Sequence, residues 1–141
     1  TYIRSESQKL DIYKRIAGIE TAEECEDMLE ELIDRFGDPP KSVLNLLAVA
    51  DLKVKAHRVY VKEIGERPEE IRFYLYEKAR LNPAGFPAFI EGFEGRMRFL
   101  SGDKPAFWYR RVKNSREEEN VMELVGGILE QMQILREDEK E

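Results

Sequence analysis

The sequence is poor in the residues that build metal centres and covalent catalytic sites. Of its 141 residues, only Cys25 is a cysteine and only His57 is a histidine. One cysteine cannot form an internal disulfide or a cysteine-based metal site, and a lone histidine is more often structural than catalytic. The Lys-Ser/Thr pair of a P-loop and the glycine spacing of a Rossmann turn are also missing. We therefore expect no cofactor, no metal and no enzymatic activity in this chain.

Two further absences concern membranes and nucleic acids. No apolar run approaches the roughly 20 residues that a membrane-spanning helix needs, and the chain starts without a basic, apolar leader. Positive charge is not in excess either, because the net charge is -6, which argues against a general nucleic-acid binder. We expect one domain over residues 1–141, no membrane partner, and a chain that is a piece of a longer protein.

Three helices are predicted in the first sixty residues. Ser5 and Thr21 each begin a capping box, in which an N-cap hydroxyl and a side chain three residues later satisfy free backbone N–H groups. Gly37 can end the second helix, and the two prolines after it prevent continuation. A wide apolar stripe predicts the third helix, from about Lys41 to about Tyr60. The core face of the first helix is expected to hold Leu10, Tyr13, Ile16 and Ala17.

The rest of the chain reads as two hairpins and two helices. Alternating apolar and polar residues predict the strands, and Asn-Pro and a capping box predict the helix starts. The glycine pair in the last helix suggests close packing of a neighbour. In chain order we expect Val61–Glu66, Ile71–Tyr76, a short helix from Asn82-Pro83, Arg96–Leu100, Ala106–Val112, and a last helix from Ser115 that contains Gly126-Gly127. The fold class is α+β: a small antiparallel sheet of hairpins flanked by about five helices.

The second helix has an unusual acidic face. From Glu20 to Asp34 there are eight acidic residues and no basic one, so no ion pair relieves the repulsion inside that segment. Carboxylates near a helix C-terminus are also disfavoured, by a few tenths of a kcal/mol to about 1 each. A solvated face is the ordinary interpretation of such a run, and a docking surface for arginines is the alternative. The residues predicted to form this protein-interaction surface are Asp27, Glu30, Glu31 and Asp34.

A basic stretch with aromatics is the best candidate for nucleic-acid contact. It runs from Phe107 to Lys113, and its possible contact residues are Trp108, Arg110 and Arg111. The structural alternative is a strand with Phe107 and Tyr109 on one face and Trp108 and Arg110 on the other. We favour the strand, because the chain as a whole is acidic. Cys25, within an apolar stripe and beside acids, is expected to be an unreactive core residue with a raised pKa.

Several short motifs, nearly all within the first sixty residues, resemble a known family. In chain order they are Tyr2-Ile3, Gln8-Lys9-Leu10, Tyr13-Lys14-Arg15-Ile16-Ala17, Glu31-Leu32-Ile33-Asp34-Arg35-Phe36-Gly37 with Pro40 soon after, and Asn45-Leu46-Leu47 with Ala50 and Leu52-Lys53. Together they resemble the C-terminal domain of the bacterial transcription-repair coupling factor. The full-length proteins of this family are multidomain, ATP-driven DNA translocases of the cytoplasm, which displace stalled RNA polymerase and recruit UvrA in nucleotide excision repair.

The resemblance implies a regulatory role for this chain. In the family, the C-terminal domain packs on the N-terminal UvrB-like module and hides the surface that UvrA binds. It has no ATPase motif, so RNA polymerase and DNA would be engaged by other domains of the full-length protein. Glu31 and Asp34 match the family's clamp contacts, for which arginines on the UvrB-like module are fitting partners. The alternative is a module that binds DNA or RNA polymerase through the basic aromatic strand.

Overall fold

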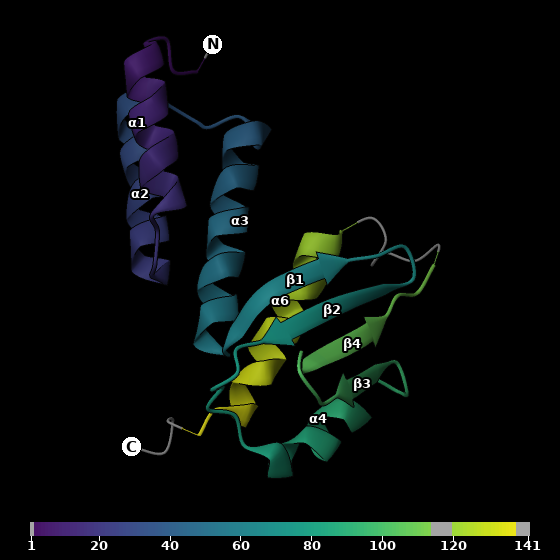
Figure 1. Ribbon diagram of the computed structural model, residues 1–141. Helices are drawn as coiled ribbons and strands as arrows, with labels where there is room; N and C mark the ends of the chain where they lie inside the picture. The colour runs from purple at the N-terminus through teal and green to yellow at the C-terminus, as the bar shows by residue number, and fades with distance from the viewer. Residues whose placement is uncertain (1, 114–119, 138–141) are drawn as a thin grey trace. The chain divides into compact units, whose positions relative to one another are not determined.

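The computed structural model describes residues 2–113 and 120–137, and the chain divides into two compact units (Figure 1). Residues Thr1–Val54 form the helical unit, and residues Lys55–Glu141 form the sheet unit. One domain can contain two such units, so a single domain over 1–141 stays a prediction.

The helical unit contains helices α1 (Glu6–Ala17) and α2 (Ala22–Phe36) and most of α3 (Lys41–Arg58). Both predicted N-caps are confirmed, because the hydroxyls of Ser5 and Thr21 accept bonds from backbone N–H groups three residues later. Gly37 is the C-cap of α2, as predicted. The buried core of the unit consists of Ile3, Ile12, Ile16, Ile19, Met28, Leu32, Val43, Leu47, Ala50 and Val54.

The predicted core face of α1 is partly wrong. Leu10 is 58% exposed and Tyr13 is 40% exposed, whereas Ile12 and Ile16 are buried. At 100° per residue, Ile16 lies roughly 40° from Ile12 around the helix axis, while Leu10 lies about 160° away. The helix therefore carries two apolar stripes, and only the isoleucine stripe meets the neighbouring helices. Periodicity cannot choose between them, because the choice depends on where those neighbours lie.

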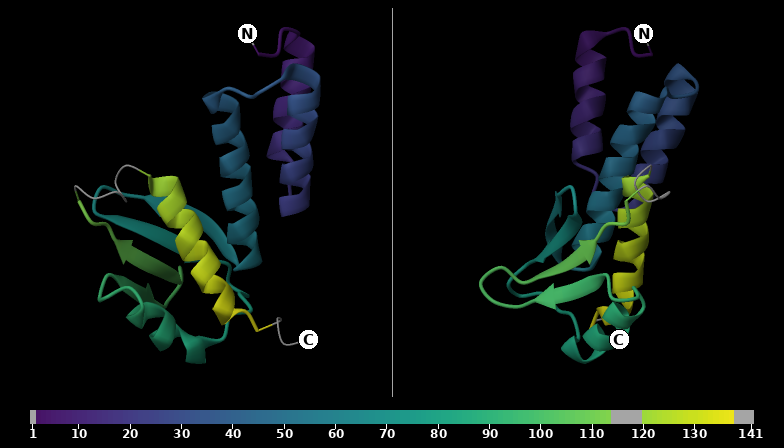
Figure 2. Two further views of the ribbon diagram at one scale, coloured as in Figure 1. Left: turned by 180° about the vertical axis from the view of Figure 1, so that it is seen from behind. Right: turned by 90° about the vertical axis from the view of Figure 1, so that its right-hand side faces the viewer.

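The sheet unit is built on four antiparallel strands, in the order β1-β2-β4-β3. Helix α6 lies across one face of the sheet (Figures 1 and 2). The elements are β1 (Val61–Glu66), β2 (Glu70–Leu75), the 3-10 turn η1 (Pro83–Gly85), α4 (Phe86–Glu91), β3 (Met97–Leu100), β4 (Ala106–Arg110), α6 (Val121–Met132) and the 3-10 turn η2 (Gln133–Leu135). Within the described residues there are five α-helices and one four-stranded antiparallel sheet, which confirms the α+β prediction.

The two faces of the sheet differ as the sequence predicts. In β4, Phe107 and Tyr109 are buried, while Trp108 and Arg110 lie on the opposite face, called the outer face below. Aromatic rings fix α4 against the buried face: the Phe86 ring packs edge-on against the Phe107 ring at 5.0 Å between centroids, and the Phe89 ring does so at 5.1 Å. Because this packing buries one face of the sheet in the core, the charged side chains of the strands lie on the outer face.

Gly127 of α6 does not have the predicted role. A Cβ added at Gly127 would meet no described atom within 4 Å, so close packing does not explain that residue, while for the buried Gly126 close packing stays a prediction. Elsewhere in the unit a neighbour does approach a glycine closely, because a Cβ on Gly85 would lie 3.0 Å from Cδ2 of Leu135. The described start of α6 has Asn120 as its N-cap, and the capping box predicted at Ser115 lies outside the described residues.

Replacing Gly37 by alanine should destabilise the chain by about 1–3 kcal/mol, because its φ of 87° and ψ of -165° suit glycine alone. Nothing crowds the site, since an added Cβ would meet no described atom within 4 Å, so the cost is conformational. Urea unfolding followed by circular dichroism measures it. Gly127→Ala is the matched control: it lies inside a helix in open space and should be neutral or stabilising by about 0.4–1 kcal/mol. Equal stability of Gly37→Ala and the parent chain would contradict this account.

Candidate functional site

The acidic face of α2 points away from the core of the helical unit. Met28 and Leu32 are buried on one side of the helix, and Asp27, Glu30 and Asp34 are exposed on the other. The period of 3.6 residues per turn produces this separation, as predicted. Among the described residues, these three carboxylates have no ion-pair partner. They form a continuous negative surface that is free to meet another molecule.

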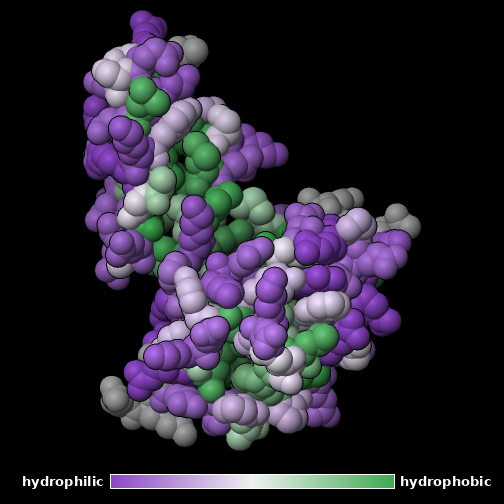
Figure 3. Space-filling model, viewed as in Figure 1, coloured by the Kyte–Doolittle hydropathy of each residue, from purple (hydrophilic) through white to green (hydrophobic). Residues whose placement is uncertain are grey.

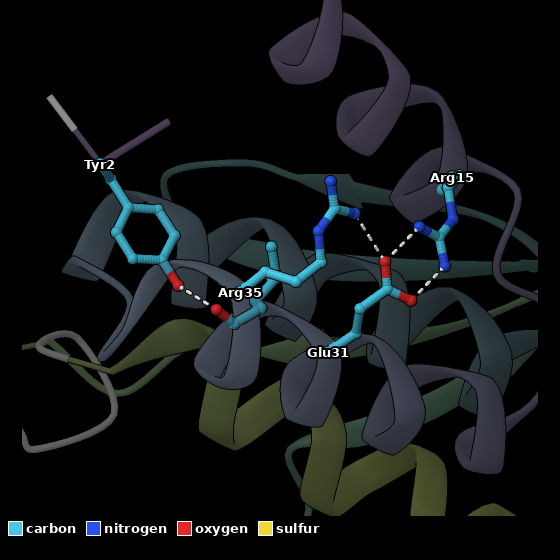
Figure 4. A network of polar contacts seen from close by, with 5 residues as sticks. Tyr2, Arg15, Glu31 and Arg35 are labelled. Atoms are coloured by element: carbon cyan, nitrogen blue, oxygen red, sulfur yellow. Dashed lines mark hydrogen bonds and ion pairs between the residues drawn. The ribbon is translucent and has the colours of Figure 1, made fainter. Parts of the chain in front are cut away.

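Glu31 differs from its neighbours, because two arginines of the same unit hold it (Figure 4). Arg15 of α1 makes a two-point contact: its Nη1 lies 2.6 Å from Oε2 of Glu31, and its Nη2 lies 2.7 Å from Oε1. Arg35 adds a third bond, from Nη1 to Oε2 at 2.9 Å. The lack of a basic residue between Glu20 and Asp34 therefore does not leave Glu31 without a partner. Arg35 lies one residue beyond the acidic segment, and Arg15 is brought in only by tertiary packing.

These contacts set the charge state of Glu31. The hydrogen bonds from Arg15 first, and then from Arg35, lower the pKa of this carboxyl from its usual 4.5 to about 2. Paired donors that fit both carboxylate oxygens fix orientation as well as charge. The side chain of Glu31 is nevertheless 32% exposed, so the brace between α1 and α2 lies at the edge of the acidic face.

Apolar side chains also reach the surface of the helical unit. Ile33 of α2 is 42% exposed. It lies three residues after Glu30 and so borders the acidic face. Figure 3 shows several hydrophobic side chains on this unit among hydrophilic ones. The other exposed large apolar residues of the unit are Leu10, Tyr13, Leu44, Leu46 and Val49. An apolar border beside a charged surface is the composition of a protein interface rather than of a metal or substrate site.

Trp108 of the basic aromatic strand lies between two arginines of the neighbouring strands. In the sheet register, Trp108 of β4 is paired with Arg72 of β2 on one side and with Arg98 of β3 on the other. The Arg72 guanidinium carbon lies 3.8 Å from the indole centroid, and that of Arg98 lies 4.8 Å from it. Because the two arginines flank the ring from opposite neighbouring strands, they cover the surfaces on which a base would stack.

The two arginines predicted beside Trp108 have separate surroundings. Arg110 is exposed on the outer face of the sheet. Arg111 is half-buried, and its Nη1 donates to the Arg67 carbonyl at 2.7 Å and to Oε2 of Glu66 at 3.2 Å. Arg111 thus ties the end of β4 to the turn between β1 and β2. The sequence could not show this difference, since both residues belong to the same basic run.

Cys25 and His57 show no sign of a reactive site. Cys25 is half-buried, and burial first, then Asp51 and Glu26, raises the pKa of its thiol, as predicted. The His57 ring lies 6.1 Å from the Tyr76 ring. No group of metal-ligating side chains occurs in the described ranges 2–113 and 120–137. No helix in those ranges is long and apolar enough to cross a membrane.

Comparisons with known proteins agree on one family. The model of the TRCF domain matches residues 1–86, which include the whole acidic face. The transcription-repair-coupling factor of Bacillus subtilis (strain 168) is 40% identical over 79 residues, covering 56% of this chain and 7% of that protein. The one of Staphylococcus epidermidis (strain ATCC 12228 / FDA PCI 1200) is 41% identical over 78 residues, covering 55% of this chain and 7% of that protein. The chain therefore spans a small part of the length of these relatives.

A solved structure extends the likeness to the sheet unit. It is described as the crystal structure of the C-terminal domain of transcription-repair coupling factor, and it matches with a TM-score of 0.77. The alignment covers 98% of this chain and 86% of that chain at 24% identity. At this identity the match establishes the fold, including the α+β architecture beyond residue 86.

Neutralising Glu31 should change how stability depends on pH. In the folded chain the pKa of Glu31 is about 2, below the usual 4.5. The ionised carboxylate therefore adds to the free energy of unfolding above pH 4.5, and this contribution is lost as the pH falls toward 2. Glu31→Gln should therefore lower the urea midpoint at pH 7, and its difference from the parent chain should shrink as the pH falls through that window. Asp34→Asn, which removes an exposed carboxylate of the same helix, is the matched control for the loss of one negative charge. If the urea midpoint of Glu31→Gln lies equally far below that of the parent chain at pH 7 and at about pH 2.5, the lowered pKa of Glu31 would be contradicted.

Proposed function

The chain belongs to the TRCF domain family, and on this premise we propose that it is the non-catalytic, autoinhibitory interaction domain of a transcription-repair coupling factor. It packs on the UvrB-like N-terminal module of the same protein and masks the surface that UvrA binds during transcription-coupled nucleotide excision repair. ATP-driven translocation on DNA, and contact with RNA polymerase, belong to other parts of this cytoplasmic protein.

The exposed carboxylates of α2 carry this proposal. Asp27, Glu30 and Asp34 lie on one helix face and have no ion pair among the described residues. Their mutual repulsion is unfavourable in the isolated unit, and arginines on a partner surface would relieve it. Ile33 at the border of this face supplies apolar area for the same contact. Folding alone gives no reason for this arrangement, whereas a basic partner surface does.

Glu31 takes a double role in the proposal. Its bonds to Arg15 and Arg35 hold α1 against α2 and so fix the direction of the acidic face. Its exposed edge leaves room for a further hydrogen bond from a partner guanidinium, because a carboxylate has about four acceptor positions. Asp34 has no internal partner among the described residues, so its full charge is available for docking. Glu31 therefore orients the surface, and Asp34 provides its main contact.

A contact of this kind is releasable. Exposed ion pairs contribute about 0–1 kcal/mol each, and couplings between sites are typically about 1–3 kcal/mol. A few such pairs are enough to keep this domain on the UvrA-binding surface in the resting protein. The domain dissociates from that surface when another part of the protein engages its target. A large, wholly apolar interface would not separate in this way.

Neutralising the acidic face in the full-length protein should release the mask. The variant Asp27→Asn with Asp34→Asn should bind UvrA about 5-fold more tightly or better, because it weakens the masked state without removing the Arg15–Glu31 brace. Titration of UvrA by surface plasmon resonance measures the change. Glu63→Gln with Glu91→Gln removes the same charge from exposed positions of the sheet unit and should have no effect. Unchanged UvrA affinity in the α2 variant, with its fold intact by circular dichroism, would refute the proposal.

A further inference from the structure

The acidic character of the chain is unevenly distributed between its units. The helical unit has twelve acidic and seven basic residues, whereas the sheet unit has seventeen acidic and sixteen basic ones. Nearly all of the net charge of -6 therefore lies in the helical unit. The argument from net charge against nucleic-acid binding applies to that unit and not to the sheet unit.

The outer face of the sheet holds a pocket of about 540 Å³, whose lining is mainly basic. We call it the cationic pocket. Arg98 of β3 and Arg110 of β4 line it from neighbouring strands, Arg96 lines it just before β3, and the backbone N–H of Arg110 bonds to the Arg96 carbonyl at 2.8 Å. Trp108, Arg111 and Lys113 also line it. All of these residues lie beyond residue 86, where the family-model match ends.

Of the described residues that line the pocket, five are basic and two are acidic, so the acids do not neutralise it. The acids are Glu69, which is exposed, and Glu70, whose carboxylate accepts a bond from Nε of Arg72, outside the pocket. Within residues 2–113 and 120–137, no carboxylate pairs with Arg96, Arg98, Arg110 or Lys113. Like charges on adjacent strand positions destabilise a sheet. Four such cations around one hollow make sense physically if an anion is bound there.

Trp108 prepares the pocket for such a ligand. Its indole holds the Arg98 guanidinium by a cation–π contact with 4.8 Å between the guanidinium carbon and the ring centroid. A side chain held in this way loses less rotamer freedom when it binds, which favours affinity. Because Arg72 lies against the same ring at 3.8 Å, the indole supports Arg98 and is not itself available for stacking.

From this arrangement we propose that the cationic pocket binds the sugar-phosphate backbone of a nucleic acid, through Arg96, Arg98, Arg110 and Lys113, without reading its sequence. Arginine forks fit phosphate oxygens, and repeated phosphates match several cations at once. A protein ligand is less suited, because interface cores are depleted in charge and rely on aromatic anchors, and here the only aromatic side chain in the lining is covered. The covered ring also excludes base readout by stacking.

Salt-dependent binding to labelled DNA of mixed sequence tests the proposal. With the whole chain and a duplex, four phosphate contacts give a slope of log K against log salt of roughly -3 to -4, between about 50 and 200 mM salt. Arg98→Gln and Arg110→Gln should each reduce the slope by about 1, and they should weaken binding equally for different sequences. Arg58→Gln, which removes an exposed arginine at the end of α3 that does not line the pocket, should leave the slope unchanged.

Three outcomes would overturn the proposal. The first is no binding to duplex or single-stranded DNA at low salt. The second is strong, base-dependent quenching of Trp108, the only tryptophan, which would mean that bases stack on its ring. The third is displacement of the DNA by a polyglutamate peptide at equal charge concentration, which would identify an acidic protein segment as the ligand.

Thermal unfolding of each variant confirms that the chain is folded. The acidic-face variants of α2 should bind DNA no less tightly than the parent chain, so this test is separate from that of UvrA masking.

Discussion

The two-point contact between Arg15 and Glu31 decides how the helical unit presents its charge. It joins α1 to α2 across sixteen residues of sequence, and Arg35 reinforces it from the next turn of α2. Met28 and Leu32 are buried on the opposite side of α2, so Asp27, Glu30 and Asp34 face outward, and the brace joins the helix to α1. The acidic face is therefore a consequence of core packing on one side and of a guanidinium brace on its edge.

Arginine has a second, different use in the sheet unit. There, a guanidinium on each side of Trp108 turns a ring that resembles a stacking platform into a support for charge. Arg96, Arg98 and Arg110 have no carboxylate partner among the described residues, and they line a pocket instead. In the helical unit, Arg15 pairs with Glu31 within the fold. In the sheet unit, the arginines of the cationic pocket present positive charge to solvent. The two surfaces thus suit partners of opposite charge.

These two surfaces also differ in their relation to the family. The acidic face lies within residues 1–86, which match the TRCF domain, and the curated relatives align over a similar length. The basic residues of the cationic pocket lie beyond residue 86, where only the fold is matched, through a structure of 24% identity. The acidic face therefore consists of residues within the family match, while the pocket is argued from this chain's own residues. Separate units allow each surface to change without disturbing the core of the other.

The sequence by itself determined the local structure: the caps at Ser5 and Thr21, the end of α2 at Gly37, and the alternation of β4. These features depend on residues a few positions apart, and backbone hydrogen bonding and side-chain period act over that range. Tertiary structure alone decided which apolar stripe of α1 is buried, that Arg15 holds Glu31, and that Arg72 and Arg98 cover Trp108. Each of these contacts joins side chains from different helices or strands. Such partners are chosen by packing in three dimensions, because no local rule relates residues that meet only when the chain has folded.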